Sequence, residues 1–316
     1  MNRPLLSIVV PLYHSADSIE RLLKELGQLP VEGGCELVLV NDGSPDNTAE
    51  LCERLMQNCP RTVTLVKLSR NFGEHNAVMA GLHHASGDYI VTMDDDLQNP
   101  PSEVLKLLNH ARSGGHEVVY SYYAKKEHET WRNLGSWLTN RVADFLLDKP
   151  RGLYLCSFRI MTRFVAQQIC HYDGPFAYVD GLILQVTQNI GTIAVKHEPR
   201  ASGQSGYTLG KLLHLWLSMF VNFSVVPLRL ATFVGFGMAG IGFIYLLSVI
   251  LEGLRGSPIQ GWSSLMAALL LFCGAQLILL GIAGEYIGRI FLTANKRPQF
   301  IVKEVTKNVP STFMHQ

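Results

Sequence analysis

The sequence has no glycine-rich phosphate loop of the dinucleotide or Walker type, although it contains 28 glycines. A helix N-terminus is therefore not expected to hold the phosphates of a nucleotide. Positive charge is not concentrated either: the net charge is +1 and no Lys/Arg run occurs, so nucleic acid is not an expected partner. The six cysteines lack the paired spacing of a metal site, and we expect free thiols in a reducing compartment.

A secretory leader is also not expected. Residues 5–10 read as a buried strand, and this apolar stretch is too short for the core of a signal peptide. This stretch begins a region of about two hundred residues. There, short apolar segments alternate with amphipathic ones, which predicts a doubly wound, mostly parallel α/β sheet. The expected strands are 6–10, 36–40, 63–68, 89–93 and 118–121, and the expected helices are 18–26, 48–57, 74–84 and 102–111.

Three consecutive acids, Asp94, Asp95 and Asp96, follow the expected strand 89–93. Three neighbouring carboxylates repel one another, and this arrangement is favourable only where a cation or several hydrogen-bond donors neutralise the charge. In an extended chain Asp94 and Asp96 project to one side, and Gln98 adds an amide oxygen there. Oxygen ligands suit Mg²⁺ or Mn²⁺, so we predict a metal site at the carboxyl end of this strand. The alternative is a solvated acidic turn ahead of the next helix.

Two long apolar runs, 228–251 and 263–288, are each long enough to cross a bilayer, which takes roughly 20 helical residues. Their short link predicts a hairpin, and the basic residues beyond its outer ends place both termini in the cytosol. Glu285 and Arg289 are one turn apart, and either an ion pair or a lipid head-group contact fits this spacing. Residues 209–223 read as an interfacial helix, with a third crossing as the alternative.

Four segments together resemble the GT-A glycosyltransferases of family 2 that act on polyprenyl phosphates. They are residues 11–13 (PLY), 40–44 (VNDGS), 68–73 (LSRNFG) and 94–101 (DDDLQNPP), and residues 284–289 (GEYIGR) add a likeness to the bacterial members. The resemblance implies a cytosolic GT-A domain over residues 1–207. An interfacial helix (208–227), a transmembrane hairpin (228–289) and a cytosolic tail (290–316) are expected to follow it.

The resemblance also implies roles for individual residues. The donor nucleotide would contact Pro11, Tyr13 and Asp42, although a capping role for Asp42 is the alternative. The same donor set includes the three acids and Arg200, and the metal ligands would be Asp94, Asp96 and Gln98. The acceptor phosphate is expected to contact three arginines and a serine of the lid segment 200–207: Arg132, Arg141, Arg159 and Ser205. For the arginines, surface ion pairs are the alternative. Asp180 has three possible roles: a contact to sugar hydroxyls, a general base or a helix cap.

Three positions depart from the family pattern. Ser15 stands where many members have glutamate, Gly206 replaces a lysine, and Leu153 is matched to an acid that several bacterial relatives carry ahead of the arginine-bearing strand. A lipid phosphate has a second pKa of about 6, so it is largely ionised at neutral pH and needs no strong base. Loss of that acid is therefore compatible with activity.

The resemblance predicts an inverting, metal-dependent transfer of a sugar from a nucleotide sugar, with UDP favoured, to a polyprenyl phosphate, with undecaprenyl favoured. The product would be a lipid-linked monosaccharide for cell-envelope glycan modification, made at the cytosolic face of the inner membrane by a multi-pass protein. Homotetramers occur among similar proteins, and the sequence does not set a subunit count. The competing hypothesis is a catalytically inactive protein that binds or translocates sugar-lipids.

Overall fold

The first unit of the chain is built on one sheet of buried strands. A computed structural model describes residues 3–123, 153–175, 177–196, 198, 226–254 and 261–308. The chain divides into two compact units, Met1–Gly206 with Lys296–Gln316, and Tyr207–Asn295. The strands of the first unit are β1 (Leu6–Leu12), β2 (Cys35–Asn41), β3 (Thr62–Leu68), β4 (Tyr89–Thr92), β5 (Val118–Tyr123), β6 (Arg159–Thr162), β7 (Ile190–Val195) and β8 (Val302–Asn308).

These strands form a single sheet in the order β7-β5-β6-β4-β1-β2-β3-β8. β6 runs antiparallel to β4 and β5, β8 runs antiparallel to β3, and the remaining neighbours are parallel. The sheet is therefore mixed but mostly parallel, which confirms the predicted fold class. Because the parallel strands end at the same edge, the turns after β1, β2 and β4 come together there.

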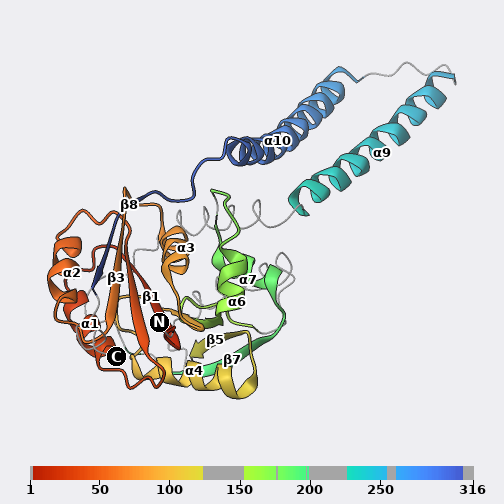
Figure 1. Cartoon of the computed structure of the whole chain (residues 1–316). Helices are drawn as coiled ribbons and strands as arrows, with labels where there is room; N and C mark the ends of the chain where they lie inside the picture. Colours follow the sequence, from red (N-terminus) through yellow and green to blue (C-terminus); the bar gives the residue numbers. More distant parts are fainter. Residues whose placement is uncertain are drawn as a thin grey trace. The chain divides into compact units, whose positions relative to one another are not determined.

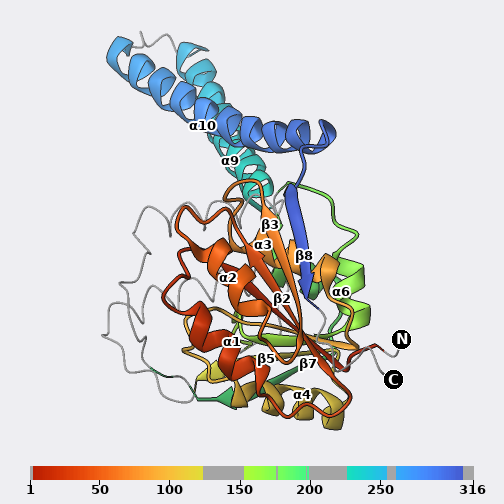
Figure 2. The same ribbon diagram turned by 60° about the vertical axis from the view of Figure 1, so that its left-hand side comes forward.

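Helices cover both faces of the sheet (Figures 1 and 2). Amphipathic α1 and α2 pack with α4 on one apolar core, while α3, α6 and α7 pack on the other. Their bounds are α1 (Ile19–Gly27), α2 (Thr48–Met56), α3 (Glu74–His84), α4 (Ser102–Gly114), α6 (Arg163–Ile169) and α7 (Val179–Val186). The five expected strands and four expected helices up to residue 121 are all present, with ends shifted by at most a few residues.

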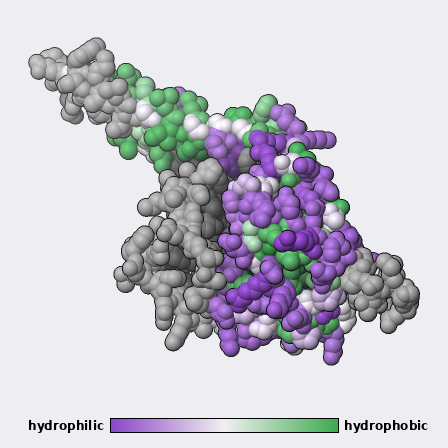
Figure 3. All heavy atoms as spheres, turned by 90° about the vertical axis from the view of Figure 1, so that its left-hand side faces the viewer, coloured by the Kyte–Doolittle hydropathy of each residue, from purple (hydrophilic) through white to green (hydrophobic). Residues whose placement is uncertain are grey.

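The second unit contains the long helices α9 (Val226–Leu254) and α10 (Trp262–Ala294). Among the described residues one helical segment, Phe272–Ala294, has the length and hydropathy needed to cross a membrane. Its apolar side is not buried against other parts of the described chain. A second apolar segment, Thr232–Ile244, is shorter. Hydrophobic surface gathers on these helices in Figure 3, whereas the visible face of the sheet unit is largely hydrophilic.

Candidate active site

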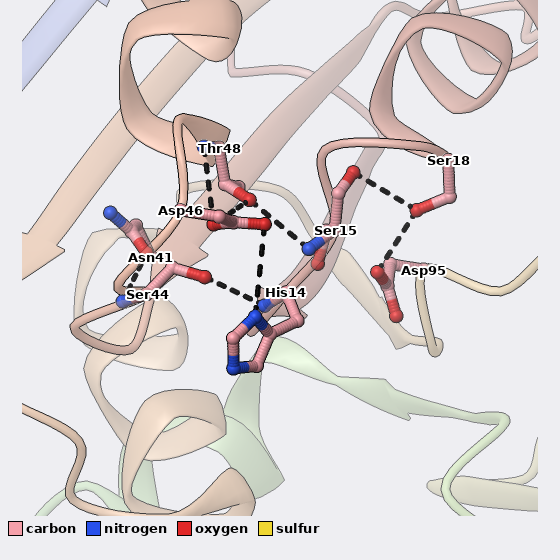
Figure 4. Close-up of polar contacts among 8 residues, drawn as sticks. All are labelled: His14, Ser15, Ser18, Asn41, Ser44, Asp46, Thr48 and Asp95. Carbon is pink, nitrogen blue, oxygen red and sulfur yellow. Dashed lines mark hydrogen bonds and ion pairs between the residues drawn. The ribbon is translucent and has the colours of Figure 1, made fainter. Parts of the chain in front are cut away.

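The turns after β1 and β2 are joined by a network of side-chain hydrogen bonds (Figure 4). The backbone N–H of His14 donates to the hydroxyl of Ser44 at 2.6 Å, and that of Ser15 donates to Thr48 at 3.1 Å. His14 has a positive φ of 58°, which turns the chain sharply after β1. Beside it, the ring of Tyr13 is 47% exposed and available to a ligand.

Asp42 directly follows β2, and its side chain is only 3% exposed. Its two carboxylate oxygens accept the backbone N–H groups of Phe72 and Gly73, at 2.7 and 2.9 Å. Burial raises the pKa of Asp42, and these two hydrogen bonds oppose the rise. Asp42 therefore braces the turn that leads into α3. The expected alternative for Asp42 was to cap the helix that follows Pro45. Its carboxylate instead binds the two residues that precede α3.

The three consecutive acids lie after β4, as expected, but the chain turns there and does not stay extended. Their carboxylates contact different parts of the fold. Asp94 accepts a hydrogen bond from Ser157 at 2.8 Å, Asp95 accepts one from Ser18 at 3.1 Å, and Asp96 accepts the backbone N–H of Gln98 at 3.1 Å. Asp95 thus faces Ser18, at the start of α1 (Figure 4).

Burial is the main cause that raises the pKa of Asp94, and the nearby charges of Asp95 and Asp96 raise it further. Its second oxygen accepts no hydrogen bond from the described part of the chain. No group of three His, Cys, Asp or Glu side chains suited to a metal occurs within the described ranges. Two carboxylates completed by water and a substrate phosphate are nevertheless a normal Mg²⁺ environment, so this donor set fits the expected ion.

The loop after the acids is tied to the end of β7. The carbonyl of Gln98 accepts the backbone N–H of Glu198 at 2.8 Å, and its side-chain amide approaches the Glu198 carbonyl at 3.5 Å. On α4, buried Glu103 accepts the backbone N–H of Lys196 at 3.3 Å. The expected lid, residues 200–207, begins directly after this tether. Arg200, Ser205 and Gly206 lie outside the described residues.

Arg159 is the first residue of β6. In the sheet register it pairs with Thr92, the last residue of β4, so it lies beside the acids. Its guanidinium is 3% exposed and forms an ion pair with Asp180 in the first turn of α7. Asp180 also accepts the hydroxyl of buried Tyr120 at 2.9 Å. The Nε of Arg159 is buried without a hydrogen-bond partner among the described residues.

Other expected positions fall elsewhere. Leu153 is 6% exposed and lies in the core beside α3, α6 and α7. Ahead of β6, the side chain that contacts Asp94 is that of Ser157. Ser157 was not expected at the site, although its place two residues before an arginine is a usable signal in the sequence. Arg132 and Arg141 lie outside the described residues.

Glu74, at the start of α3, is a second residue near the acids that was not expected from the sequence. Surrounding protein raises its pKa to about 7, and the charge of Asp94 adds to the rise. Its side chain is nevertheless exposed to solvent. Two further charges act on the Glu74 carboxyl: Arg159 lowers its pKa and Asp180 raises it.

Comparison with known proteins identifies both units. The family described as "Glycosyl transferase family 2" matches residues 7–177, and "GtrB C-terminal hairpin" matches residues 226–290. A Pseudomonas aeruginosa (strain LESB58) protein named "Undecaprenyl-phosphate 4-deoxy-4-formamido-L-arabinose transferase" is 33% identical over 97% of this chain and 92% of its own. A Yersinia pestis (strain Pestoides F) protein of the same name is 32% identical over 96% and 95%.

Solved structures confirm the fold. Glucosyl-3-phosphoglycerate synthase from Mycobacterium tuberculosis, in complex with Mn²⁺ and UDP-glucose, superimposes with a TM-score of 0.53 at 20% identity, over 69% of this chain and 78% of that one. Its complex with phosphoglyceric acid gives a TM-score of 0.52 at 18% identity, over 70% and 80%. At this identity the similarity concerns the fold alone.

Proposed function

The chain belongs to glycosyl transferase family 2 and is a glycosyltransferase, and from this premise we propose that it transfers a sugar from a nucleotide sugar to undecaprenyl phosphate. The observation that carries the proposal is similarity over nearly the whole chain, hairpin included, to proteins named as undecaprenyl-phosphate transferases. UDP is the proposed nucleotide, because a structure of the same fold holds UDP-glucose. The product is a lipid-linked monosaccharide for modification of an envelope glycan.

The proposed reaction is a single displacement with inversion at the anomeric carbon. A phosphate oxygen of the lipid forms the new bond to that carbon, and the bond to the β-phosphate oxygen of the nucleotide breaks, so the nucleoside diphosphate leaves with the electron pair. The lipid phosphate is already ionised near neutral pH and has no need of a strong base.

Asp94, Asp96 and Gln98 would hold Mg²⁺ or Mn²⁺. The bound ion would offset the negative charge that develops on the departing diphosphate. Ser157 holds the Asp94 carboxylate and Glu198 holds the loop that carries Gln98, so these groups need little rearrangement when the donor binds.

The remaining expected residues keep their proposed roles. We propose that Pro11, Tyr13, Asp42, Asp95 and Arg200 contact the donor. The hydrogen bonds of Asp42 and Asp95 indicate that these two act by shaping the turns around it. Four residues would contact the acceptor phosphate: Arg132, Arg141, Arg159 and Ser205.

We propose that α9 and α10 form a membrane hairpin with both ends in the cytosol. β8 follows α10 and pairs with β3, so the chain returns to the sheet unit that it left before α9. A return of this kind requires an even number of crossings, which argues against the alternative of a third span within residues 209–223. The proposed location is therefore the inner membrane, with the sheet unit in the cytosol and residues 208–227 at the interface.

A donor screen tests this function. The purified protein is incubated with undecaprenyl phosphate, Mn²⁺ or Mg²⁺ and a panel of labelled nucleotide sugars, and lipid product is extracted. We expect an EDTA-sensitive product with one donor, and a loss of roughly 100-fold in Asp96→Asn. Asp88→Asn, at the opposite end of β4, is the matched control and should retain activity. Absence of lipid product with every donor would overturn the proposal.

A further inference from the structure

The turn ahead of β6 is held in place from two neighbouring strands. The hydroxyl of Thr92, at the end of β4, donates to the Ser157 carbonyl at 2.6 Å. The hydroxyl of Ser121, in β5, donates to the Phe158 carbonyl at 2.7 Å. Both side chains are almost fully buried, at 1% and 0% exposure. The backbone of Ser157 is therefore fixed relative to β4, the strand that carries the acids.

This fixed backbone directs the Ser157 hydroxyl at a single target. Its Oγ donates to Oδ2 of Asp94 at 2.8 Å, a normal length for a hydrogen bond to a carboxylate. Asp94 Oδ1 accepts nothing from the described residues. One oxygen of Asp94 is thus occupied by the protein, and the other remains available to a ligand.

We propose that Ser157 is a positioning residue that selects the metal-binding orientation of Asp94. This inference rests on the proposed function, since it assumes that Asp94 binds the ion. Hydrogen bonds to a ligating carboxylate fix its orientation, and their removal typically weakens metal binding or activity about 10- to 100-fold. Ser157 itself touches neither ion nor substrate in this role.

The competing explanation is that Ser157 only stabilises the turn. Ser121 separates the two explanations, because its hydroxyl forms a hydrogen bond of similar length to the same turn but does not contact Asp94. Ser121→Ala removes turn stabilisation alone. Ser157→Ala removes the contact with Asp94, and Ser157→Thr keeps a hydroxyl at the same position.

The test measures Mn²⁺ binding to the full-length protein in the presence of UDP, by electron paramagnetic resonance of free Mn²⁺. We expect Ser157→Ala to weaken binding about 10-fold, Ser121→Ala to stay within about 2-fold of wild type, and Ser157→Thr to recover most of the loss. In activity assays Ser157→Ala should raise the Mn²⁺ concentration for half activation by a similar factor, with kcat at saturating Mn²⁺ little changed. Equal Mn²⁺ affinity of Ser157→Ala and Ser121→Ala would overturn the inference.

A further variant separates failure of this inference from failure of the proposed function. Asp94→Asn should abolish measurable Mn²⁺ binding. Wild-type affinity in Asp94→Asn would overturn the metal site itself, whereas weak binding there together with wild-type affinity in Ser157→Ala would overturn only the role of Ser157. If Ser157→Ala does not fold, Ser157→Cys keeps the volume with a weaker donor, and its Mn²⁺ affinity should again fall below that of Ser121→Ala.

Discussion

At Gly43 the turn after β2 lies against the turn after β3. Gly43 has φ +62°, and a Cβ there would meet the carbonyl carbon of Arg70 at 2.3 Å. Gly115, at the end of α4, has nearly the same φ of +63° but open space around it. Both substitutions to alanine cost about 1–2 kcal/mol for the left-handed backbone, and Gly43→Ala adds a backbone clash.

We therefore expect Gly43→Ala to lower Tm clearly more than Gly115→Ala, as followed by thermal unfolding in detergent. Because the clash displaces the turn that follows Asp42, donor affinity should fall in Gly43→Ala and stay unchanged in Gly115→Ala. Equal Tm values for the two variants would show that the close approach of the turns has no energetic consequence.

His75 makes stability depend on pH. Burial beside the ring of Tyr178, at 5.0 Å, lowers its pKa to about 4 from an ordinary value of 6.5. Between these values the unfolded chain binds the proton and the folded protein does not, so this contribution to stability rises with pH from about 4 to 6.5. Glu74, whose pKa is raised to about 7, contributes with the opposite sign from 4.5 to 7.

The variant His75→Phe isolates the histidine, since Glu74 is present in both proteins and a ring is retained. We expect Tm of the variant minus Tm of wild type to increase as the pH falls from 7 to 5. Thermal unfolding at half-unit pH steps measures this difference. A difference that does not change with pH would contradict the assignment.

At the scale of elements, β8 completes the sheet after the helical unit. It pairs with β3 through six residues, Val63–Leu68, and Lys67 of β3 forms ion pairs with Glu53 of α2 and Glu304 of β8. The Asn308 side chain also donates to the Met56 carbonyl at 2.6 Å. Without β8, the inner strand β3 would become an exposed edge, which favours aggregation.

Truncation tests this prediction. Removal of residues 299–316 should lower Tm by at least about 5 °C and produce aggregates in size-exclusion chromatography. The control removes only residues 309–316, which follow β8, and should behave like wild type. Similar Tm values for both truncations would mean that β8 contributes little to the sheet.

At the scale of the whole molecule, the return of the chain to the sheet fixes the expected topology. Reporter fusions in bacterial cells test it directly. Alkaline phosphatase inserted in the link 255–261 should be active, since that link is expected outside the cytosol, and the same enzyme fused after residue 316 should be inactive. An active fusion at residue 316 would contradict a hairpin with two cytosolic ends.

The sequence determined the elements that depend on local pattern. Buried strands such as Leu6–Leu12 and amphipathic helices such as α1 carry their periodicity within a few residues, so they were predicted. The acidic run after β4 was recognisable for the same reason. β6, β7 and β8 were not predicted. β6 has only four residues, β7 is a partly exposed strand at the edge of the sheet, and β8 is a half-exposed strand whose partner lies more than two hundred positions earlier.

How the site residues face one another depends on contacts between segments that are distant in the sequence. Consecutive Asp94 and Asp95 are chemically identical, yet one contacts Ser157 and the other Ser18, because different elements pack on either side of the turn. Likewise, the sequence identified Arg159 but not its buried ion pair with Asp180. Residue types and their local pattern can be read from the sequence. The direction of a side chain depends on neighbours that folding brings together from distant positions.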